Sequence, residues 1–537
     1  MVGRWFGALV LVGAVGSMAL AQPPRPQPGD SPGTPPKPAA KTTQIGQPDA
    51  SKSQPAQPND ERPAADNPSE PKGVGRPPAA EDDQGGARRE ELELLQLFVD
   101  TLDQVQRNYV KDISRRELYE AAIRGLLTKL DQHSSYIPPD DIESFKGSVE
   151  SEFGGIGIQV SLEGGRLIVI SPLVGTPAYR AGIQAGDWIS EINGQTTRDI
   201  TLDEAVKRMK GKIGTTVRVT VVHARDGKSE ALTLAREVVR VETVLGDRRR
   251  ADDSWDFLLD HERKIGYIRL TSFGRHTPNE LRKALQQLAD QQVRALILDV
   301  RFNPGGLLSA AIDVSDLFVA DGRIVSTVGR NVDEQVVYAK REGTYGDFPL
   351  VVLANQFSAS ASEIVAACLQ DHERAIVVGE RTWGKGSVQN IIELEGGRSA
   401  LKLTTASYQR PNGRNIHRFE GAGEEDEWGV KPSPGYEVKL SVDELRGLIE
   451  QRRQRDIVGP QAAELPPLEQ ADKQLAKALE YLRGKLPEPR REPAADGKDK
   501  PAAPAGKPAT PAEKPAAPPE KPAAPGDAAG KPPAPPR

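Results

Sequence analysis

The sequence is poor in cysteine, histidine and aromatic residues: it has one cysteine, six histidines and 5% aromatics among 537 residues. A single cysteine, Cys368, cannot form an intramolecular disulfide, so an apolar core has to hold the folded part together. Its setting, IVAACLQD, predicts a buried helical position with no catalytic role. The formal net charge is −5, with both signs interspersed. This balance argues against nucleic acid as a partner.

Long apolar runs are also lacking, except at the N-terminus. The segment MVGRWFGALVLVGAVGSMALAQ places Arg4 before an apolar run and ends in a small-residue cleavage site. We expect residues 1–21 to be a secretory signal peptide, which directs the protein to the periplasm or cell envelope. The run is slightly short for a membrane span, although an uncleaved membrane anchor is the alternative.

Proline is abundant, but it is concentrated at the two ends of the chain. Of 45 prolines, 16 lie in residues 22–80 and another 16 in residues 487–537. These regions have few large apolar side chains, so they cannot bury enough surface to offset the entropy of ordering. We therefore predict a disordered Pro-rich linker over 22–88 and a disordered Lys/Pro/Ala-rich tail over 487–537.

Between these ends, the residues 89–147 have helical periodicity. Apolar side chains recur at helical spacing from Leu92 to Val105, and RRELYEAAIRGLLTKL continues the pattern after a break. Two helices are expected in this region. The segment DQHSSYIPPDD then interrupts the periodicity.

The residues 148–236 alternate like short strands that tight turns connect, followed by one amphipathic helix. Thr201 and Glu204 form a T-x-x-E capping box, and Leu202, Val206 and Met209 share one helix face. The order of elements, with FGGIGIQV and AGIQAGDWISEING, resembles a bacterial-type PDZ domain. That resemblance implies that a peptide C-terminus pairs with the strand after the GGIGI turn, whose amides hold its carboxylate. The implied peptide-binding residues are Gly155, Ile156, Gly157, Ile158, Val206 and Met209. A glycine-rich hairpin without a ligand is the alternative.

The residues 237–445 change to an α/β pattern, and a C-terminal helical segment is expected over 446–486. IGYIRL, RALILDV, PLVVLAN and RAIVVG have the composition of buried strands. PNELRKALQQLADQQ, GGLLSAAIDVSDLF and SEIVAACLQ alternate with them as helices. The fold class predicted for the whole chain is therefore multidomain α/β, with N-terminal helices, a PDZ domain, a βαβ core and disordered tails.

The segment GERTWGKGS resembles a phosphate-binding loop that departs at one position. Gly379, Gly384 and Lys385 fit that pattern, but Gly386 stands where a hydroxyl would be needed for Mg²⁺. The following residues, SVQNIIELEGG, have strand composition rather than helical periodicity. A nucleotide site is therefore not expected, and a solvated lysine on a glycine turn is the simplest alternative.

Two strand-to-helix junctions carry residues suited to acyl transfer. In LILDVRFNPGGLL, the amides of Gly305 and Gly306 lie at a helix N-terminus and suit an oxyanion. In NQFSASASEIVAA, Ser360 and Glu363 form an S-x-x-E capping box, which accounts for only one of three alternating serines. A glycine-rich turn and an ordinary helix cap are the structural alternatives.

A nucleophilic serine needs a base, and none of the six histidines lies in a triad motif. Lys385 is the better candidate, because desolvation would lower its pKa and allow the neutral amine to take a proton. The pKa would have to fall by roughly 2 to 3 units from about 10.4. Gln389 could orient this amine without restoring its charge, although it could also be an ordinary polar strand residue.

Together, LDQHSSYI, FGGIGIQV, LILDVRFNPGGLL, NQFSASASEIVAACLQD, VVGERTWGKGSVQ and LKLTTASYQRPNGRNI resemble the carboxyl-terminal processing, or tail-specific, proteases over about residues 92–435. The resemblance implies that Ser360 is the nucleophile, Lys385 the base and Gln389 the orienting residue. It also implies an oxyanion hole formed by the amides of Ala361 and of the Gly305-Gly306 turn.

The sequence departs from this family pattern in three places. Gln132 replaces the usual proline, Ser433 replaces the usual aspartate, and the acidic insertion GAGEEDE precedes that segment. None of them involves the proposed dyad, but the change at Ser433 bears on the local edge of the core.

The sequence thus predicts an exported serine endopeptidase that needs no metal or other cofactor. Its expected substrates are proteins or peptides with free C-termini. An adaptor protein and homo-oligomer formation are left open. A catalytically inactive PDZ scaffold of the cell envelope is the main alternative, and a Ser/His/Asp hydrolase of small esters is a more distant one.

Overall fold

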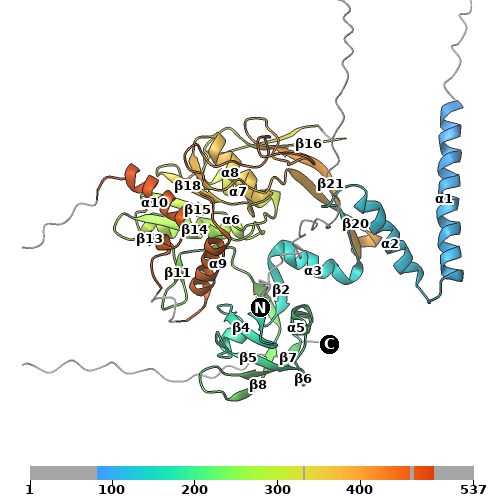
Figure 1. Ribbon diagram of the computed structural model, residues 1–537, viewed down its shortest axis with the longest axis horizontal. Coiled ribbons are helices and arrows are strands. Elements are labelled where there is room, and N and C mark those ends of the chain that lie inside the picture. Colours follow the sequence, from blue (N-terminus) through green and yellow to red (C-terminus); the bar gives the residue numbers. More distant parts are fainter. Residues whose placement is uncertain (1–81, 331–332, 460–464, 489–537) are drawn as a thin grey trace, which may run out of the picture. The chain divides into compact units, whose positions relative to one another are not determined.

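The computed structural model describes residues 82–330, 333–459 and 465–488 (Figure 1). The predicted signal peptide, the linker up to residue 81 and the tail from residue 489 lie outside the described residues. Among the residues that are described, no helix combines the length and apolar character that crossing a bilayer requires.

The folded part begins with two helices, α1 (Asp82–Asn108) and α2 (Arg115–Thr128). Helix α1 starts within the region expected to be linker, because the Arg- and Glu-rich ARREEL favours helix and extends the apolar pattern toward the N-terminus. Ser114 caps α2 in a reciprocal capping box with Glu117. A third helix, α3 (Pro139–Glu150), was not expected, since its apolar residues are sparse.

The PDZ-like unit is an antiparallel sheet with strand order β3-β4-β5-β7-β8, and β6 pairs with β5. Its elements are β3 (Ile158–Glu163), β4 (Arg166–Pro172), α4 (Pro177–Arg180), β5 (Trp188–Ile192), β6 (Gln195–Thr196), α5 (Leu202–Met209), β7 (Thr216–Val222) and β8 (Ser229–Ala235). Thr201 caps α5 by accepting the Glu204 amide, as the sequence predicted. Within the described part of the chain, strand β3 pairs with β4 alone, so its outer edge is unpaired there.

The two connections of this unit form a β-ribbon. Strand β2 (Glu152–Gly155) pairs antiparallel with β9 (Glu237–Arg240). The chain therefore enters and leaves the unit through one two-stranded ribbon rather than through two independent linkers.

The central sheet has strand order β10-β14-β15-β18-β19, and β13 pairs with β14 (Figure 1). These strands are β10 (Val244–Leu245), β13 (Leu258–Asp260), β14 (Ile265–Leu270), β15 (Ala295–Asp299), β18 (Leu350–Ala354) and β19 (Ala375–Gly379). Between them lie α6 (Thr277–Asp290), α7 (Leu308–Asp316) and α8 (Ala361–Asp371). The four strands β14, β15, β18 and β19 are parallel, so the ends of β15 and β18 lie at one edge of the sheet.

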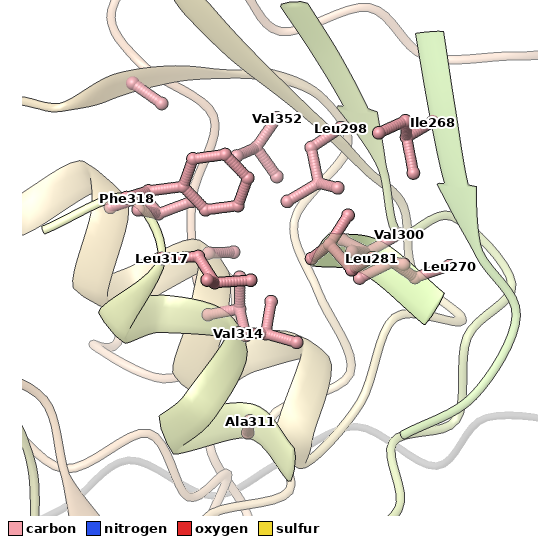
Figure 2. Packing of buried hydrophobic residues seen from close by; sticks show 14 of the residues in the cluster. Ile268, Leu270, Leu281, Leu298, Val300, Ala311, Val314, Leu317, Phe318 and Val352 are labelled. Atoms are coloured by element: carbon pink, nitrogen blue, oxygen red, sulfur yellow. The ribbon is translucent and has the colours of Figure 1, made fainter. Parts of the chain in front are cut away.

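Alternate residues along these strands are buried on the two faces of the sheet. One face packs against α6, α7 and α8, and Figure 2 shows Leu298 and Val352 pointing toward Val314 and Phe318. The other face packs against α9 (Val442–Asp456) and α10 (Lys473–Lys485). Cys368 is fully buried in α8, in the expected structural position.

A second sheet, not predicted as a unit, has strand order β1-β21-β16-β17, with β20 paired to β21. Its strands are β1 (Ser135–Ile137), β16 (Arg323–Gly329), β17 (Gln335–Tyr338), β20 (Ser387–Leu394) and β21 (Ser399–Gln409). Its pairings link residues far apart in sequence, such as Ser135 with Lys402. The DQHSSY segment is thereby placed beside the strand that carries Tyr408. Two short strands, β11 (Arg248–Arg249) and β12 (Trp255–Asp256), pair separately.

Ser433, the residue that departs from the family pattern, pairs with β19. The Ser433 amide donates to the Val377 carbonyl at 2.8 Å, and the Val377 amide donates to the Ser433 hydroxyl at 3.0 Å. The serine hydroxyl therefore satisfies a main-chain amide at this edge of the core.

Candidate active site

The three alternating serines at the start of α8 have different environments. The Ser358 hydroxyl donates to the Val300 carbonyl at 2.9 Å, and the Ser362 hydroxyl donates to the Asn303 carbonyl at 2.9 Å. Both hydroxyls hold the serine loop against the end of β15. The Ser360 hydroxyl donates to no main-chain group among the described residues. Of the three serine hydroxyls, that of Ser360 is therefore the one whose proton is not used in a hydrogen bond to the main chain.

Ser360 also has an unusual backbone conformation, with φ 57° and ψ −114°. A positive φ is rare for a residue other than glycine, and such strained residues cluster at functional sites. Ser360 and Glu363 form the expected capping box, in which the Glu363 carboxylate accepts the Ser360 amide at 2.8 Å. The Glu363 amide also donates to the Ser360 carbonyl at 2.9 Å.

The Glu363 carboxylate is completely buried and joins the serine turn to the lysine loop. Its Oε2 accepts the amides of Ser360 and Lys385, both at 2.8 Å. Its Oε1 accepts the Gly384 amide at 2.7 Å and the Thr382 hydroxyl at 2.6 Å. Burial raises the pKa of Glu363, and these hydrogen bonds oppose that effect. One carboxylate thus fixes the backbones of both expected catalytic residues.

The Gly305-Gly306 turn packs directly against the serine turn. A Cβ atom on Gly305, whose φ is +104°, would lie 2.8 Å from the Ser360 Cβ and 2.9 Å from the Ala361 nitrogen. The Gly305 amide, however, donates to Asn303 Oδ1 at 2.9 Å. Among the described residues, no acceptor is bonded to the amides of Gly306 and Ala361. In this conformation the amides of Gly306 and Ala361 are available to an oxyanion, and the amide of Gly305 is not.

Lys385 lies on the loop that precedes β20 and is partly buried. Burial, with a smaller effect from the nearby positive charge of Lys402, lowers the pKa of Lys385 from 10.5 to about 8, while Glu363 and Asp131 oppose the shift. A lysine with this pKa has a substantial neutral fraction near pH 8 and can act as a general base. No hydrogen bond joins Lys385 Nζ to Ser360 Oγ within the described part of the chain.

Gln389 is on β20, at a register irregularity opposite Thr404 of β21. Its amide nitrogen donates to the Ser387 hydroxyl at 2.8 Å and to the Thr404 hydroxyl at 3.3 Å. These contacts orient the Gln389 side chain, but none of the described hydrogen bonds connects it to Lys385. Its orienting role therefore stays a prediction.

Sequence reasoning missed the contribution of the DQHSSY segment. Asp131 accepts the amides of His133 and Ser134 and also the Ser134 hydroxyl. Ser134 in turn accepts the Thr404 amide at 3.1 Å. Through Thr404, the N-terminal segment thus supports the strand residue that faces Gln389. Its pairing partner is about 270 positions away, so no local pattern could have indicated this contact.

Tyr408 on β21 was also missed, although it contacts the predicted nucleophile. Its hydroxyl lies 3.2 Å from Ser360 Oγ, within hydrogen-bond distance. None of the hydrogen bonds among the described residues joins a histidine to Ser360; the His372 ring, for example, is bonded to the Arg323 carbonyl at 2.7 Å. The described residues therefore offer no Ser/His pair at this serine.

A groove in the PDZ-like unit contains every residue predicted to bind peptide. It is lined by Phe153, Gly155, Ile156, Gly157, Ile158, Val206, Met209 and Lys210. The amides of Ile156 and Gly157 have no acceptor among the described residues. Lys210, which the sequence analysis overlooked, places its ammonium 4.3 Å from the centre of the Phe153 ring. The groove therefore combines an open strand edge, free amides and one positive charge.

Comparison with known proteins gives the class to which this fold and site correspond. Residues 264–428 match the model of peptidase family S41, and residues 147–222 match that of the PDZ domain. The chain is thus a serine-type peptidase with a PDZ domain.

The chain is 38% identical to a carboxy-terminal-processing protease of Bartonella bacilliformis, over 73% of this chain and 89% of the relative. It is 37% identical to a carboxyl-terminal-processing protease of Synechocystis sp., over 59% and 72%. A solved structure, the photosystem II D1 C-terminal processing protease, is 27% identical, with a TM-score of 0.37, over 64% of this chain and 92% of that one. This chain belongs to the carboxy-terminal processing proteases.

Proposed function

We propose that this protein is an endopeptidase with a Ser360/Lys385 dyad that cleaves exported proteins near their C-termini. In this proposal, the PDZ domain binds the substrate tail and controls access to the site. The observation that carries the dyad is the shared buried carboxylate: Glu363 binds the amides of both Ser360 and Lys385 at 2.8 Å. A nucleophile and its base need such a fixed relation, because the proton must pass between them over hydrogen-bond distance.

The chemistry follows from the groups around Ser360. Neutral Lys385 takes the proton of the Ser360 hydroxyl while Oγ forms a bond to the scissile carbonyl carbon, and the carbonyl π electrons move to the oxygen. The amides of Gly306 and Ala361, which have no acceptor among the described residues, are available to that oxyanion. As the C–N bond breaks, the Lys385 ammonium returns a proton to the leaving amine. Water then hydrolyses the ester with Lys385 again acting as the base.

Tail recognition is supported by the free edge of β3 and the amides beside it. An extended peptide can add to an unpaired strand edge, and free amides in a glycine turn suit a terminal carboxylate. The groove side chains Val206 and Met209 favour a small or apolar last residue. Lys210 adds a positive charge near the turn, and burial lowers its pKa. A peptide with a free acid should thus bind better than its amide.

The β2/β9 ribbon supports a gating role for the PDZ domain. Both connections are parts of one two-stranded ribbon, so a change at one strand must be shared by the other. Tail binding next to β2 could therefore act on both connections at once. Export is proposed from residues 1–21 alone, which lie outside the described residues.

The dyad is tested with purified protein and a labelled peptide whose cleavage products are identified by mass. Ser360→Ala and Lys385→Met should each reduce turnover to background, because nucleophile and base act as a unit. Lys385→Arg should also be inactive, since a guanidinium stays protonated. Lys439→Met is the matched control, because Lys439 is exposed and pairs with Glu437. Wild-type turnover in Ser360→Ala would exclude this nucleophile, and a folded wild-type protein that cleaves no peptide would favour the inactive PDZ scaffold.

Tail recognition is tested separately by comparing the free-acid and amidated forms of one substrate. The full-length enzyme should cleave the free acid faster, and Lys210→Met should reduce this preference. Deletion of residues 148–236 should remove it, whether the basal rate rises or falls. Equal cleavage of both peptides by the full-length enzyme would refute tail recognition without affecting the dyad.

A further inference from the structure

The side chain of Tyr408 contacts the Ser360 hydroxyl. Tyr408 lies on β21 and is only 4% exposed. Its phenolic oxygen is 3.2 Å from Ser360 Oγ, and either atom could donate. The structure thus places a second hydroxyl directly on the predicted reacting atom.

Two features hold the Tyr408 hydroxyl in this position. The ring belongs to the main apolar cluster of the core. The Tyr408 amide donates to the carbonyl of Gly386 at 2.8 Å, and Gly386 immediately follows Lys385. The same residue is therefore tied through its backbone to the lysine loop and through its hydroxyl to the serine turn. A tyrosine held at both ends can keep a fixed geometry while the reaction proceeds.

The chemistry decides the direction of the hydrogen bond. A serine hydroxyl has one proton and two acceptor lone pairs. If that proton is to pass to Lys385, the other partner of Oγ must donate to it rather than accept from it. A phenol can do so while it remains protonated, and burial raises the pKa of Tyr408. The phenol is thus neutral in the pH range in which Lys385, with a pKa of about 8, becomes a base.

We propose that Tyr408 is a third catalytic residue, whose phenolic O–H donates a hydrogen bond to Ser360 Oγ and directs the seryl proton toward Lys385. This inference rests on the proposed dyad and adds a residue to it. As the seryl proton leaves, negative charge develops on Oγ, and a hydrogen bond to a charged acceptor is stronger than one to a neutral acceptor. The interaction is therefore stronger in the transition state than in the ground state and accelerates attack. The phenol keeps its own proton throughout, so the proton transfer to Lys385 is unchanged.

The opposite arrangement makes a contrary prediction. If Ser360 donated to Tyr408, the hydrogen bond would hold the seryl proton away from Lys385 and restrain the nucleophile. Removal of the phenolic oxygen would then increase the rate. A decrease or an increase in the rate of the variant therefore distinguishes donation by Tyr408 from donation by Ser360.

The test is Tyr408→Phe in the full-length chain, which removes one oxygen and keeps the ring in the core. We expect kcat to fall about 10- to 100-fold, in the range of a single lost transition-state hydrogen bond or somewhat less. KM should change less than about twofold, because the phenol does not form the tail groove. The midpoint of the pH–rate profile should stay near that of the wild type, since Tyr408 is not the base. Tyr136→Phe is the matched control: Tyr136 is also buried, but its hydroxyl is bonded to Arg116.

A second readout, the labelling rate of Ser360 by a fluorophosphonate, requires no peptide substrate. This rate should fall with Tyr408→Phe by about the same factor as kcat. Wild-type rates of labelling and turnover in a folded Tyr408→Phe protein, or faster rates, would overturn the role of Tyr408 while leaving the dyad intact. Absence of labelling in the folded wild-type protein, or labelling that persists in Ser360→Ala, would remove the nucleophile and with it both proposals.

A conservative variant covers the case in which phenylalanine disturbs folding. Site-specific replacement of Tyr408 by 3-fluorotyrosine retains the hydroxyl and lowers the pKa of the phenol. Activity should be close to wild type at neutral pH and should fall at alkaline pH, where the phenolate can no longer donate. An unchanged alkaline limb, or an activity that rises there, would contradict donation by Tyr408.

Discussion

Replacement of Lys385 by methionine should abolish turnover and, at neutral pH, stabilise the fold. The ammonium of Lys385 is partly removed from water, which lowers its pKa from 10.5 to about 8. Each pKa unit corresponds to about 1.4 kcal/mol of differential stability. The protonated side chain is therefore about 3 kcal/mol less favourable in the folded protein than in the unfolded chain. Methionine fills a similar volume and does not have this cost.

The pH dependence gives this prediction its sign. Between pH 8 and 10.5 the unfolded chain binds more protons at Lys385 than the folded protein, so this residue makes wild-type stability rise with pH. At pH 7 the low folded-state pKa of Lys385 reduces the free energy of unfolding by nearly its full amount. By pH 9.5 this reduction is about 2 kcal/mol smaller. The stability advantage of Lys385→Met over wild type should thus shrink by about 2 kcal/mol between these pH values.

The assay is urea unfolding of both proteins at pH 7 and pH 9.5, so that other titrating groups cancel in the difference. Turnover of the wild-type enzyme should rise about tenfold from pH 6 to pH 7 and level off above about pH 9, because it follows the neutral fraction of Lys385. A stability difference that does not change with pH, together with a rate that does not change between pH 6 and pH 8, would refute a lysine of lowered pKa at this site.

Other changes test the surroundings of the site. Lys402→Met removes a positive charge that lowers the pKa of Lys385, so the midpoint of the pH–rate profile should move to a higher pH. Asp472→Asn should cost about 3 to 5 kcal/mol in urea unfolding, because Asp472 pairs with the fully buried Arg301 next to the oxyanion turn. In the PDZ domain, the hydrogen bond to Glu230, with Asp187 on the other ring nitrogen, raises the pKa of His223. The stability from this group is fully present below about pH 6.5 and is lost as pH rises through the higher folded value, so hydrogen exchange of PDZ amides should accelerate more over this range than in a His223→Gln variant.

The sequence predicted the central sheet well, because its signals are local. IGYIRL, RALILDV, PLVVLAN and RAIVVG are short apolar runs, and each became a buried parallel strand. The N-cap at Thr201 and the strand-to-helix turn at Ser360 were also readable, since a few neighbouring residues define them, although the Glu204 side chain does not complete the capping box expected there. Helix boundaries were less certain, as the early start of α1 shows. Frayed or polar helix ends carry little hydrophobic signal.

The parts that could not be predicted depend on contacts between distant segments. Asp131 reaches the site because β1 pairs with β21, and Tyr408 is held on β21 by pairing with Thr327 of β16. Neither pairing can be read from the sequence of one strand, because a strand with alternating side chains can pair with many partners. Even the Gly305 amide, which local reasoning assigned to the oxyanion, is instead bonded to Asn303.

Residues that local sequence indicates and residues that distant strand pairing brings in therefore have different roles in the site. The proposed nucleophile Ser360, its proposed base Lys385 and the free amides lie on loops at the ends of strands, where local sequence marks them. The groups that set their behaviour come from the second sheet: Lys402 lowers the pKa of Lys385, and Tyr408 contacts Ser360 Oγ. Both lie on β21, six positions apart. A displacement of β21 would alter the base and the nucleophile together. Substitutions that shift this strand should consequently change the pH midpoint and kcat in parallel, whereas a change in the PDZ groove should alter the preference for a free C-terminus without moving the pH midpoint.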